Sequence, residues 1–163
     1  MGHHLTALIG QPASLEPIAA EIEAPAPTTL PFDLAIIPLG HKQLDRLTGT
    51  AAFNHRDGFI HLSAELEHGI GAAAPEARLL YLETEYFGGV GYQGAALFEQ
   101  GRVVWQDRLD EEEGTRDGKT PISEGLSRMG VVPAPGSDEF DSVGLVRFRH
   151  MEDLGLIEDD DWD

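Results

Sequence analysis

The sequence predicts a single α+β domain, in which an antiparallel sheet containing a meander is packed by three to five short helices. Three observations predict this class. Residues 78–105 form three strand-like runs separated by glycine-rich turns. Other segments carry apolar residues at helical spacing. The chain has 163 residues, 41% hydrophobic and 25% charged, which suits one globular domain. We expect this domain to span residues 1–155 and an acidic tail to span residues 156–163.

The elements before the meander are short. Residues 5–9 predict a strand, and a helix follows in which Ser14 is a candidate N-cap and Leu15 to Ile22 carry apolar residues at helical spacing. Prolines between residues 24 and 31 favour an extended connector. Residues 34–39 then form an apolar run that predicts a further strand.

Two features limit the elements predicted in the middle of the chain. Pro38 lacks an amide donor, so its strand should end there or lie at a sheet edge. After a helical turn carrying Leu44 and Leu47, residues 59–74 predict a second helix, which Gly69 and Gly71 weaken near its end.

The meander is the clearest element of the sequence. Residues 78–86, 92–99 and 102–105 predict its strands, with a glycine-rich turn or bulge at 88–91 and a tight turn at 100–101. The glycine-rich segment leads into another strand rather than a helix, which argues against a phosphate-binding loop.

The last third of the chain returns to helices. Residues 107–119 predict an exposed charged loop, and Thr120-Pro121 predicts the start of a helix that ends at Gly130. Ser137 is a candidate cap for one more short helix, and residues 145–148 predict a strand. We expect the acidic end of the chain to be disordered until it is bound.

Charge excludes several functions. The chain has 29 acidic and 11 basic residues, a formal net charge of -18. Such a surface repels phosphate backbones and anionic lipids and attracts cationic partners, so we expect neither nucleic-acid nor membrane binding. The N-terminal residues predict neither a signal peptide nor a membrane span. Solubility alone is the alternative explanation of the charge.

Residue types limit the chemistry further. The absence of cysteine excludes disulfides, thiolate metal sites and cysteine nucleophiles, and it fits a reducing cytoplasm. His3 and His4 are adjacent and should point to opposite faces of a strand, while the other histidines form no pair typical of a metal site. His61 and His68 could share one helix face. We expect no metal and no cofactor.

Glu83 and Glu85 are the best polar candidates, because they lie two residues apart and therefore on one face of a strand. Paired carboxylates can perform acid/base chemistry, hold a metal or recognise a partner. They can equally form a solvated sheet face or ion pairs with Arg78, Arg102 or Arg108. The sequence leaves these alternatives open.

Two stretches resemble known families. Residues 57–63, Asp-Gly-Phe-Ile-His-Leu-Ser, are similar to the DGFIHLS signature of a small uncharacterised bacterial family with an ADP-ribosyltransferase-like fold. That family's later His-Leu-Tyr-Gly segment is absent here, and we interpret the match as coincidental. Residues 83–93 and 138–153 resemble small acidic bacterial proteins that act as immunity partners of secreted toxins. This second resemblance implies a cytoplasmic binder without a cofactor that blocks a toxin's active site.

We therefore expect a non-enzymatic acidic binding protein, an immunity or antitoxin-like inhibitor whose surface docks on a basic toxin domain. The alternative is a small hydrolase or transferase that uses Glu83, Glu85 and a histidine near the glycine-rich turn. The partner's identity and the oligomeric state stay open. The residues expected to contact the partner are Glu83, Glu85, Tyr86, Tyr92, Gln93, Asp110, Glu111, Glu112 and Glu113.

Overall fold

Six strands form one antiparallel sheet in the order β2-β3-β1-β4-β5-β6. The computed structural model describes residues 2–49, 59–87, 90–111 and 118–156. The predicted α+β class with an antiparallel, meander-containing sheet is confirmed. The strands are β1 (His3–Gly10), β2 (Thr28–Leu30), β3 (Leu34–Pro38), β4 (Leu79–Phe87), β5 (Val90–Glu99) and β6 (Arg102–Asp110).

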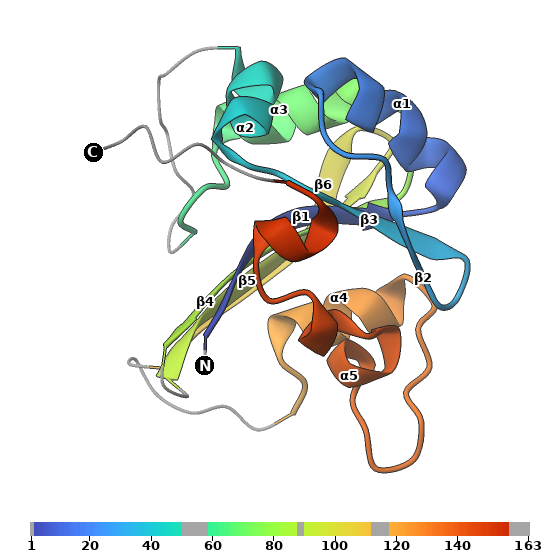
Figure 1. Cartoon of the computed structure of the whole chain (residues 1–163), viewed down its shortest axis with the longest axis vertical. Helices are drawn as coiled ribbons and strands as arrows, with labels where there is room; N and C mark the ends of the chain where they lie inside the picture. Colours follow the sequence, from blue (N-terminus) through green and yellow to red (C-terminus); the bar gives the residue numbers. More distant parts are fainter. Residues whose placement is uncertain (1, 50–58, 88–89, 112–117, 157–163) are drawn as a thin grey trace.

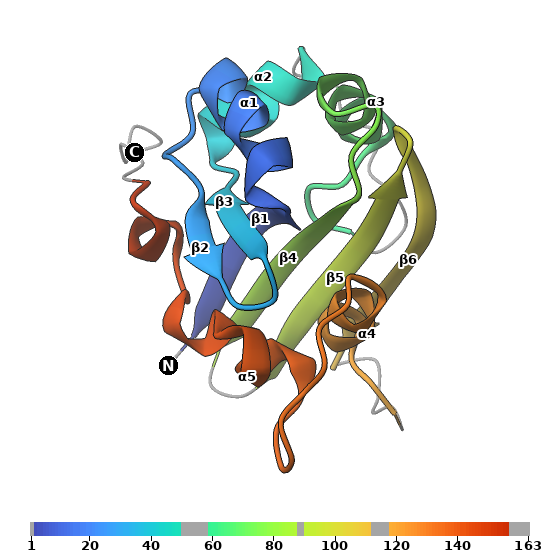
Figure 2. The same cartoon turned by 90° about the vertical axis from the view of Figure 1, so that its right-hand side faces the viewer.

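Helices cover both faces of this sheet. In Figures 1 and 2, α1, α2 and α3 group on one side of the molecule and α4 and α5 on the other. In the described residues the helical elements are α1 (Pro12–Ile22), α2 (His41–Thr48), α3 (Ala64–Ala73), α4 (Pro121–Arg128), α5 (Glu139–Val143) and the 3-10 helices η1 (Leu145–Arg147) and η2 (Met151–Leu154).

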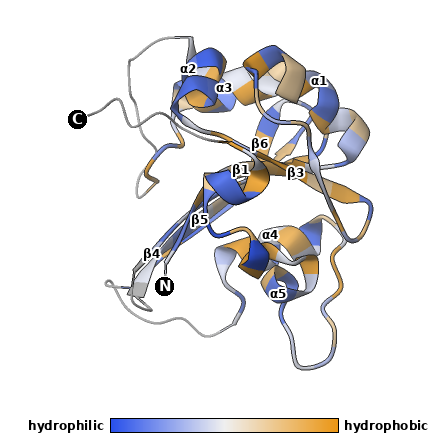
Figure 3. Ribbon diagram, viewed as in Figure 1, coloured by the Kyte–Doolittle hydropathy of each residue, from blue (hydrophilic) through white to orange (hydrophobic). Residues whose placement is uncertain are grey.

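Alternation along the strands divides the core into two parts. Tyr81 packs with α1 and α3 on one face, whereas Leu80 and Leu82 pack with Ile122 and Leu126 of α4 on the other. We call these the α1–α3 face and the α4 face. The central strands are buried on both sides, and the hydrophobic colour accordingly runs along β3 and the adjoining part of β1 in Figure 3.

The meander follows the prediction closely. Gln100 and Gly101 both have positive φ, 53° and 77°, and they form the tight turn between β5 and β6. β6 continues to Asp110, so the segment from Asp107, predicted as loop, begins as strand. Residues 112–117 and residues 157–163 of the tail predicted at 156–163 lie outside the described residues.

Short-range signals misplaced several other elements. The proline-rich connector contains β2, which pairs with Leu34 to Ile36 of β3. Pro38 is the last residue of β3, so the strand ends there as predicted; Pro38 still lies in register with Ala7 of β1 but beyond the stretch that pairs with β2. The helix predicted after Ser14 already starts at Pro12.

Three further predictions were wrong. Residues 59–62 form a loop, and α3 starts only at Ala64, where Ser63 accepts a hydrogen bond from the Leu66 amide. Asp138, rather than Ser137, caps α5 by accepting from the Asp141 amide. The strand predicted at 145–148 is the 3-10 helix η1, which follows Gly144 at a φ of 90°.

Gly69 does more than weaken α3. A Cβ atom at Gly69 would lie 1.9 Å from the carbonyl oxygen of Leu47 in α2, so glycine permits the close approach of the two helices. The contact with α3 therefore helps to position α2.

Within the described residues, no helix is long and apolar enough to cross a membrane.

Candidate functional site

The Glu83 carboxylate is buried on the α1–α3 face, where the side chain is 1% exposed. Its oxygens accept hydrogen bonds from three consecutive backbone amides, those of Ile60 at 2.5 Å, His61 at 3.1 Å and Leu62 at 3.2 Å. The hydroxyls of Tyr81 and Tyr92 also donate to it, at 2.5 and 2.7 Å. Five donors fill the roughly four lone-pair positions that a carboxylate offers.

Sheet register explains why this carboxylate can be covered. Glu83 lies opposite Gly94 of β5. A Cβ atom at Gly94 would lie 2.5 Å from the Tyr92 hydroxyl and 2.7 Å from the Phe59 ring. Glycine therefore leaves the space in which Phe59 and the loop at 59–62 pack down onto Glu83.

The two tyrosines remain hydroxyl donors. Burial raises the pKa of Tyr81 well above its ordinary value, and the adjacent Glu83 carboxylate raises it further. Burial and then Glu83 also raise the pKa of Tyr92. Both phenols therefore stay protonated at neutral pH. Together with the loop amides, they make Glu83 an internal anchor for the backbone around His61.

Glu85 shares the face of Glu83 but is exposed. Adjacent strands place four residues in one row across the sheet, namely His4 of β1, Glu85 of β4, Tyr92 of β5 and Asp110 of β6. Glu111 follows Asp110 at the end of β6 and is exposed. Its amide donates to the Gly91 carbonyl at 2.9 Å, and its side chain lies toward Tyr86 on the opposite face of the sheet. We call Glu85, Asp110 and Glu111 the acidic row.

The acidic row has a compact geometry. Glu85 and Asp110 are separated by two strand spacings, roughly 10 Å. Arg108 lies in the neighbouring row of the same face, opposite Gly94. Glu83 makes none of the ion pairs considered for it in the sequence, and Arg78 instead pairs with Glu99 at 2.9 Å.

Tyr86 and Gln93 lie on the opposite, α4 face. The Gln93 amide donates to the Tyr86 hydroxyl at 2.8 Å, and its oxygen accepts from the Ile122 amide at 2.9 Å, which ties β5 to the start of α4. Gln93 is buried, as are Glu83 and Tyr92. Because these three side chains are buried within the fold, a partner cannot contact them directly in this structure. Glu112 and Glu113 lie outside the described residues.

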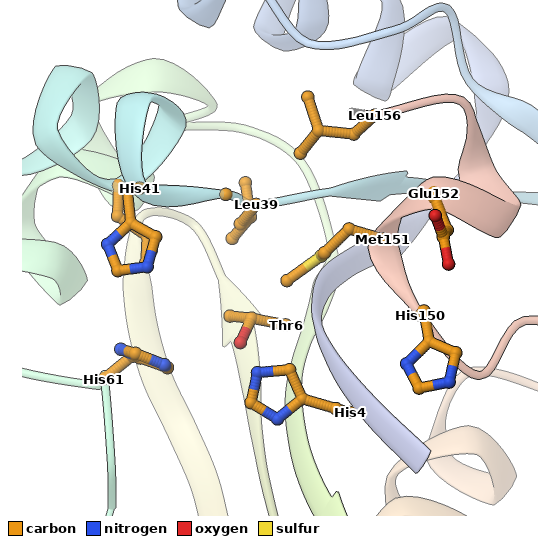
Figure 4. A pocket seen from close by; sticks show the side chains of 11 residues that line it. His4, Thr6, Leu39, His41, His61, His150, Met151, Glu152 and Leu156 are labelled. Atoms are coloured by element: carbon orange, nitrogen blue, oxygen red, sulfur yellow. The ribbon is translucent and has the colours of Figure 1, made fainter. Parts of the chain in front are cut away.

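A pocket of about 310 Å³ adjoins the acidic row on the α1–α3 face. Four histidines from four separate segments contribute to it, and we call it the histidine pocket (Figure 4). In the view of Figure 4, His41, His61 and His4 surround one side, Glu152 and His150 lie on the other, and Met151 reaches between them. The lining residues are His4, Thr6, Leu39, Gly40, His41, Leu44, His61, His150, Met151, Glu152 and Leu156.

Each wall of the histidine pocket is fixed by a nearby interaction. The Glu83 anchor holds the His61 backbone. The Gly40 amide, where α2 begins, donates to the Gln43 side chain at 3.0 Å. The Asp153 carboxylate accepts from the His150 amide at 3.1 Å and so holds η2.

The sequence did not predict that these four histidines lie around one pocket. His61 lies in a loop, so the predicted helix face shared with His68 is wrong. His4, His41 and His150 carry no local spacing signal, because each comes from a different element. Within the described part of the chain, no three His, Asp or Glu side chains form a group that could hold a metal ion.

His3 occupies the other side of β1 from His4, as adjacent strand residues should. Its Nε2 donates to the Leu145 carbonyl at 3.2 Å, and its Nδ1 accepts from the Thr84 hydroxyl at 2.7 Å. Burial lowers the pKa of His3, although the Leu145 hydrogen bond opposes that shift. His3 is therefore a structural residue of the α4 face.

Comparisons with protein-family models, with curated proteins and with solved structures found no match for this chain.

Proposed function

We propose that this chain is a non-enzymatic acidic binding protein that docks a basic protein partner, in the manner of an immunity or antitoxin-like inhibitor acting in the cytoplasm. The observation that carries the proposal is the acidic row at the end of the sheet. Glu85 and Glu111 are exposed there, and Asp110 precedes Glu111 at the end of β6, two strands from Glu85. A net charge of -18 attracts the same kind of partner over longer distances.

A rigid scaffold supports recognition by the acidic row. Its carboxylates project from β4 and from the end of β6, the two strands that flank β5, rather than from an independent loop. Their spacing is therefore set before a partner arrives, which lowers the entropy lost on binding. Salt bridges to lysine or arginine at such a surface mainly increase the association rate and weaken as salt increases.

The alternative, a hydrolase or transferase that uses Glu83, receives less support. A catalytic carboxylate must exchange a proton with a substrate or a water molecule. Glu83 is 1% exposed and accepts hydrogen bonds from five internal donors, three of which are backbone amides of the loop at 59–62. Its geometry suits an anchor better than a base.

Affinity purification from a lysate of the native cells tests the proposal. Three forms of the protein are immobilised and compared. The first is the wild type, and the second carries Glu85→Lys, Asp110→Lys and Glu111→Lys. The third is a charge-matched control with Glu16→Lys, Glu21→Lys and Asp33→Lys, exposed positions away from the acidic row.

The proposal predicts a basic partner that binds the wild type and the control but not the acidic-row variant. The complex should weaken as ionic strength rises through about 0.15 M. Binding that is indifferent to salt, or lost equally in both variants, contradicts the proposal. If the partner is a toxin, only the wild type and the control should relieve its toxicity.

A further inference from the structure

We propose that the histidine pocket receives one lysine or arginine side chain of the basic partner and thereby anchors it beside the acidic row. This inference rests on the proposed function and names the part of the partner that the pocket recognises. Three properties of the pocket support it: its charge, its combination of apolar and polar walls, and its place next to the acidic row.

The charge of the pocket favours a cation. Glu152 is among the lining residues, and none of the described lining residues is lysine or arginine. Glu85 lies directly opposite His4 in the sheet, with Cβ atoms roughly 5 Å apart as for such strand pairs. A cation that enters therefore meets carboxylates on two sides, whereas an anion would meet the field of a chain with net charge -18.

The walls match the two parts of a basic side chain. Leu39, Leu44, Met151 and Leu156 provide apolar surface for the methylene groups, which long cationic side chains bury readily. The Thr6 hydroxyl offers an acceptor near the floor, and the side chains of His4 and His150 add polar surface at the rim. Thr6 is only 4% exposed, so its side chain lies below the rim of the pocket.

The rim of the pocket is exposed and adjoins the acidic row through His4. His4, His41 and His150 are exposed at the rim, while Thr6 is buried below them. The row His4–Glu85–Tyr92–Asp110 runs from this rim across the sheet. A partner that pairs with Glu85 can therefore place a neighbouring basic side chain in the pocket without a change in the backbone.

A pair of short peptides tests the anchor. One alternates arginine and glycine, with acetylated and amidated ends, and the other replaces each arginine by citrulline, which is neutral and has nearly the same shape. Affinity is measured by fluorescence anisotropy, and the place of binding by the imidazole resonances of His4, His61 and His150. The variants are Met151→Trp, which fills the pocket, and Glu152→Gln, with Glu76→Gln as an exposed control far from it.

The inference predicts that the arginine peptide binds and shifts the three imidazole resonances, and that the citrulline peptide does neither. Met151→Trp should weaken binding about tenfold or more, as for a buried anchor at an interface. Glu152→Gln should weaken it less, and Glu76→Gln should not change it. Near-ultraviolet circular dichroism and thermal unfolding confirm that each variant is folded.

The opposing results separate the anchor from the proposed function. Equal binding of both peptides overturns the cationic occupant. Arginine binding that leaves the imidazole resonances unchanged and survives Met151→Trp overturns the pocket assignment, while the acidic-row proposal stands. No binding of the arginine peptide overturns the anchor, and the affinity purification then decides the proposed function on its own.

Discussion

The Glu83 carboxylate accepts a hydrogen bond from the His61 backbone amide at 3.1 Å, although the two residues lie 22 positions apart. This contact links the centre of the sheet to the rim of the histidine pocket. The residue that seemed the best candidate for surface chemistry is therefore an internal support. Its role is to set the position of a neighbouring loop.

Replacing Glu83 by glutamine should destabilise the protein substantially. The side-chain amide can accept fewer of the five hydrogen bonds and places its own NH2 group against the donors. We expect the free energy of unfolding to fall by about 2–4 kcal/mol, as for loss of buried charge-assisted hydrogen bonds. Urea denaturation measures this change. The control Glu85→Gln, at an exposed position, should stay within about 0.5 kcal/mol of the wild type; an equal effect of both contradicts the anchor.

The tyrosines should make the fold sensitive to alkali. The chain has three tyrosines, and burial raises the pKa of Tyr81, Tyr86 and Tyr92. In the unfolded chain phenols lose their protons near pH 10, whereas the folded protein retains them. Stability is therefore complete below about pH 10 and is lost as the pH rises above it. Tyrosinate absorbance should rise together with unfolding measured by circular dichroism; a smooth titration of the folded protein near pH 10 contradicts this expectation.

His3 should make the fold sensitive to acid. Its folded pKa is lowered, so its contribution to stability is complete above the unfolded value of about 6.5 and is lost as the pH falls toward the folded pKa. Between pH 7.5 and 5.5, His3→Gln should lose less stability than the wild type does. His4→Gln, the exposed neighbour, serves as the comparison in the same thermal or urea unfolding series. Identical pH profiles for the wild type and His3→Gln would show that His3 does not carry this dependence.

Lys119 should contribute more to the stability of the fold than its exposure suggests. Its ammonium group pairs at 2.5 Å with Glu139, whose side chain is 2% exposed. Lys119→Met leaves that carboxylate buried without this partner and should destabilise the protein more than the loss of an exposed pair does, although solvent around the half-exposed Lys119 screens the interaction. Arg78→Met breaks the exposed pair with Glu99 and should cost less than about 1 kcal/mol. Adding Glu139→Leu to Lys119→Met should restore much of the loss; no recovery would argue against an unpaired charge as its cause.

Local patterns were sufficient where the chain pairs with its own neighbours. Alternation along 78–86 and the turn at Gln100-Gly101 predicted the meander, because adjacent strands joined by short turns need no distant information. Thr120-Pro121 likewise marked the start of α4. β2 was missed because its three residues lie among prolines and form a strand only by pairing with β3.

The site depended on contacts that no local pattern contains. Residues 59–62 carry apolar residues that fit a helix, but their amides instead donate to Glu83, more than twenty positions later. The face shared by Glu83 and Glu85 was predictable from their spacing, whereas the burial of only the first depends on Gly94 and Phe59. The histidine pocket combines four segments and had no counterpart in the spacing of its residues.

Amide hydrogen exchange on the complex with the purified basic partner locates the binding surface. We expect new protection at the ends of β4, β5 and β6, in residues 84–86, 91–93 and 108–111, and at the rim around His4 and His150. It predicts no new protection in α4 or α5 on the opposite face. Protection confined to α4 and α5, with the acidic row unchanged, would contradict the claim that this row is the binding surface.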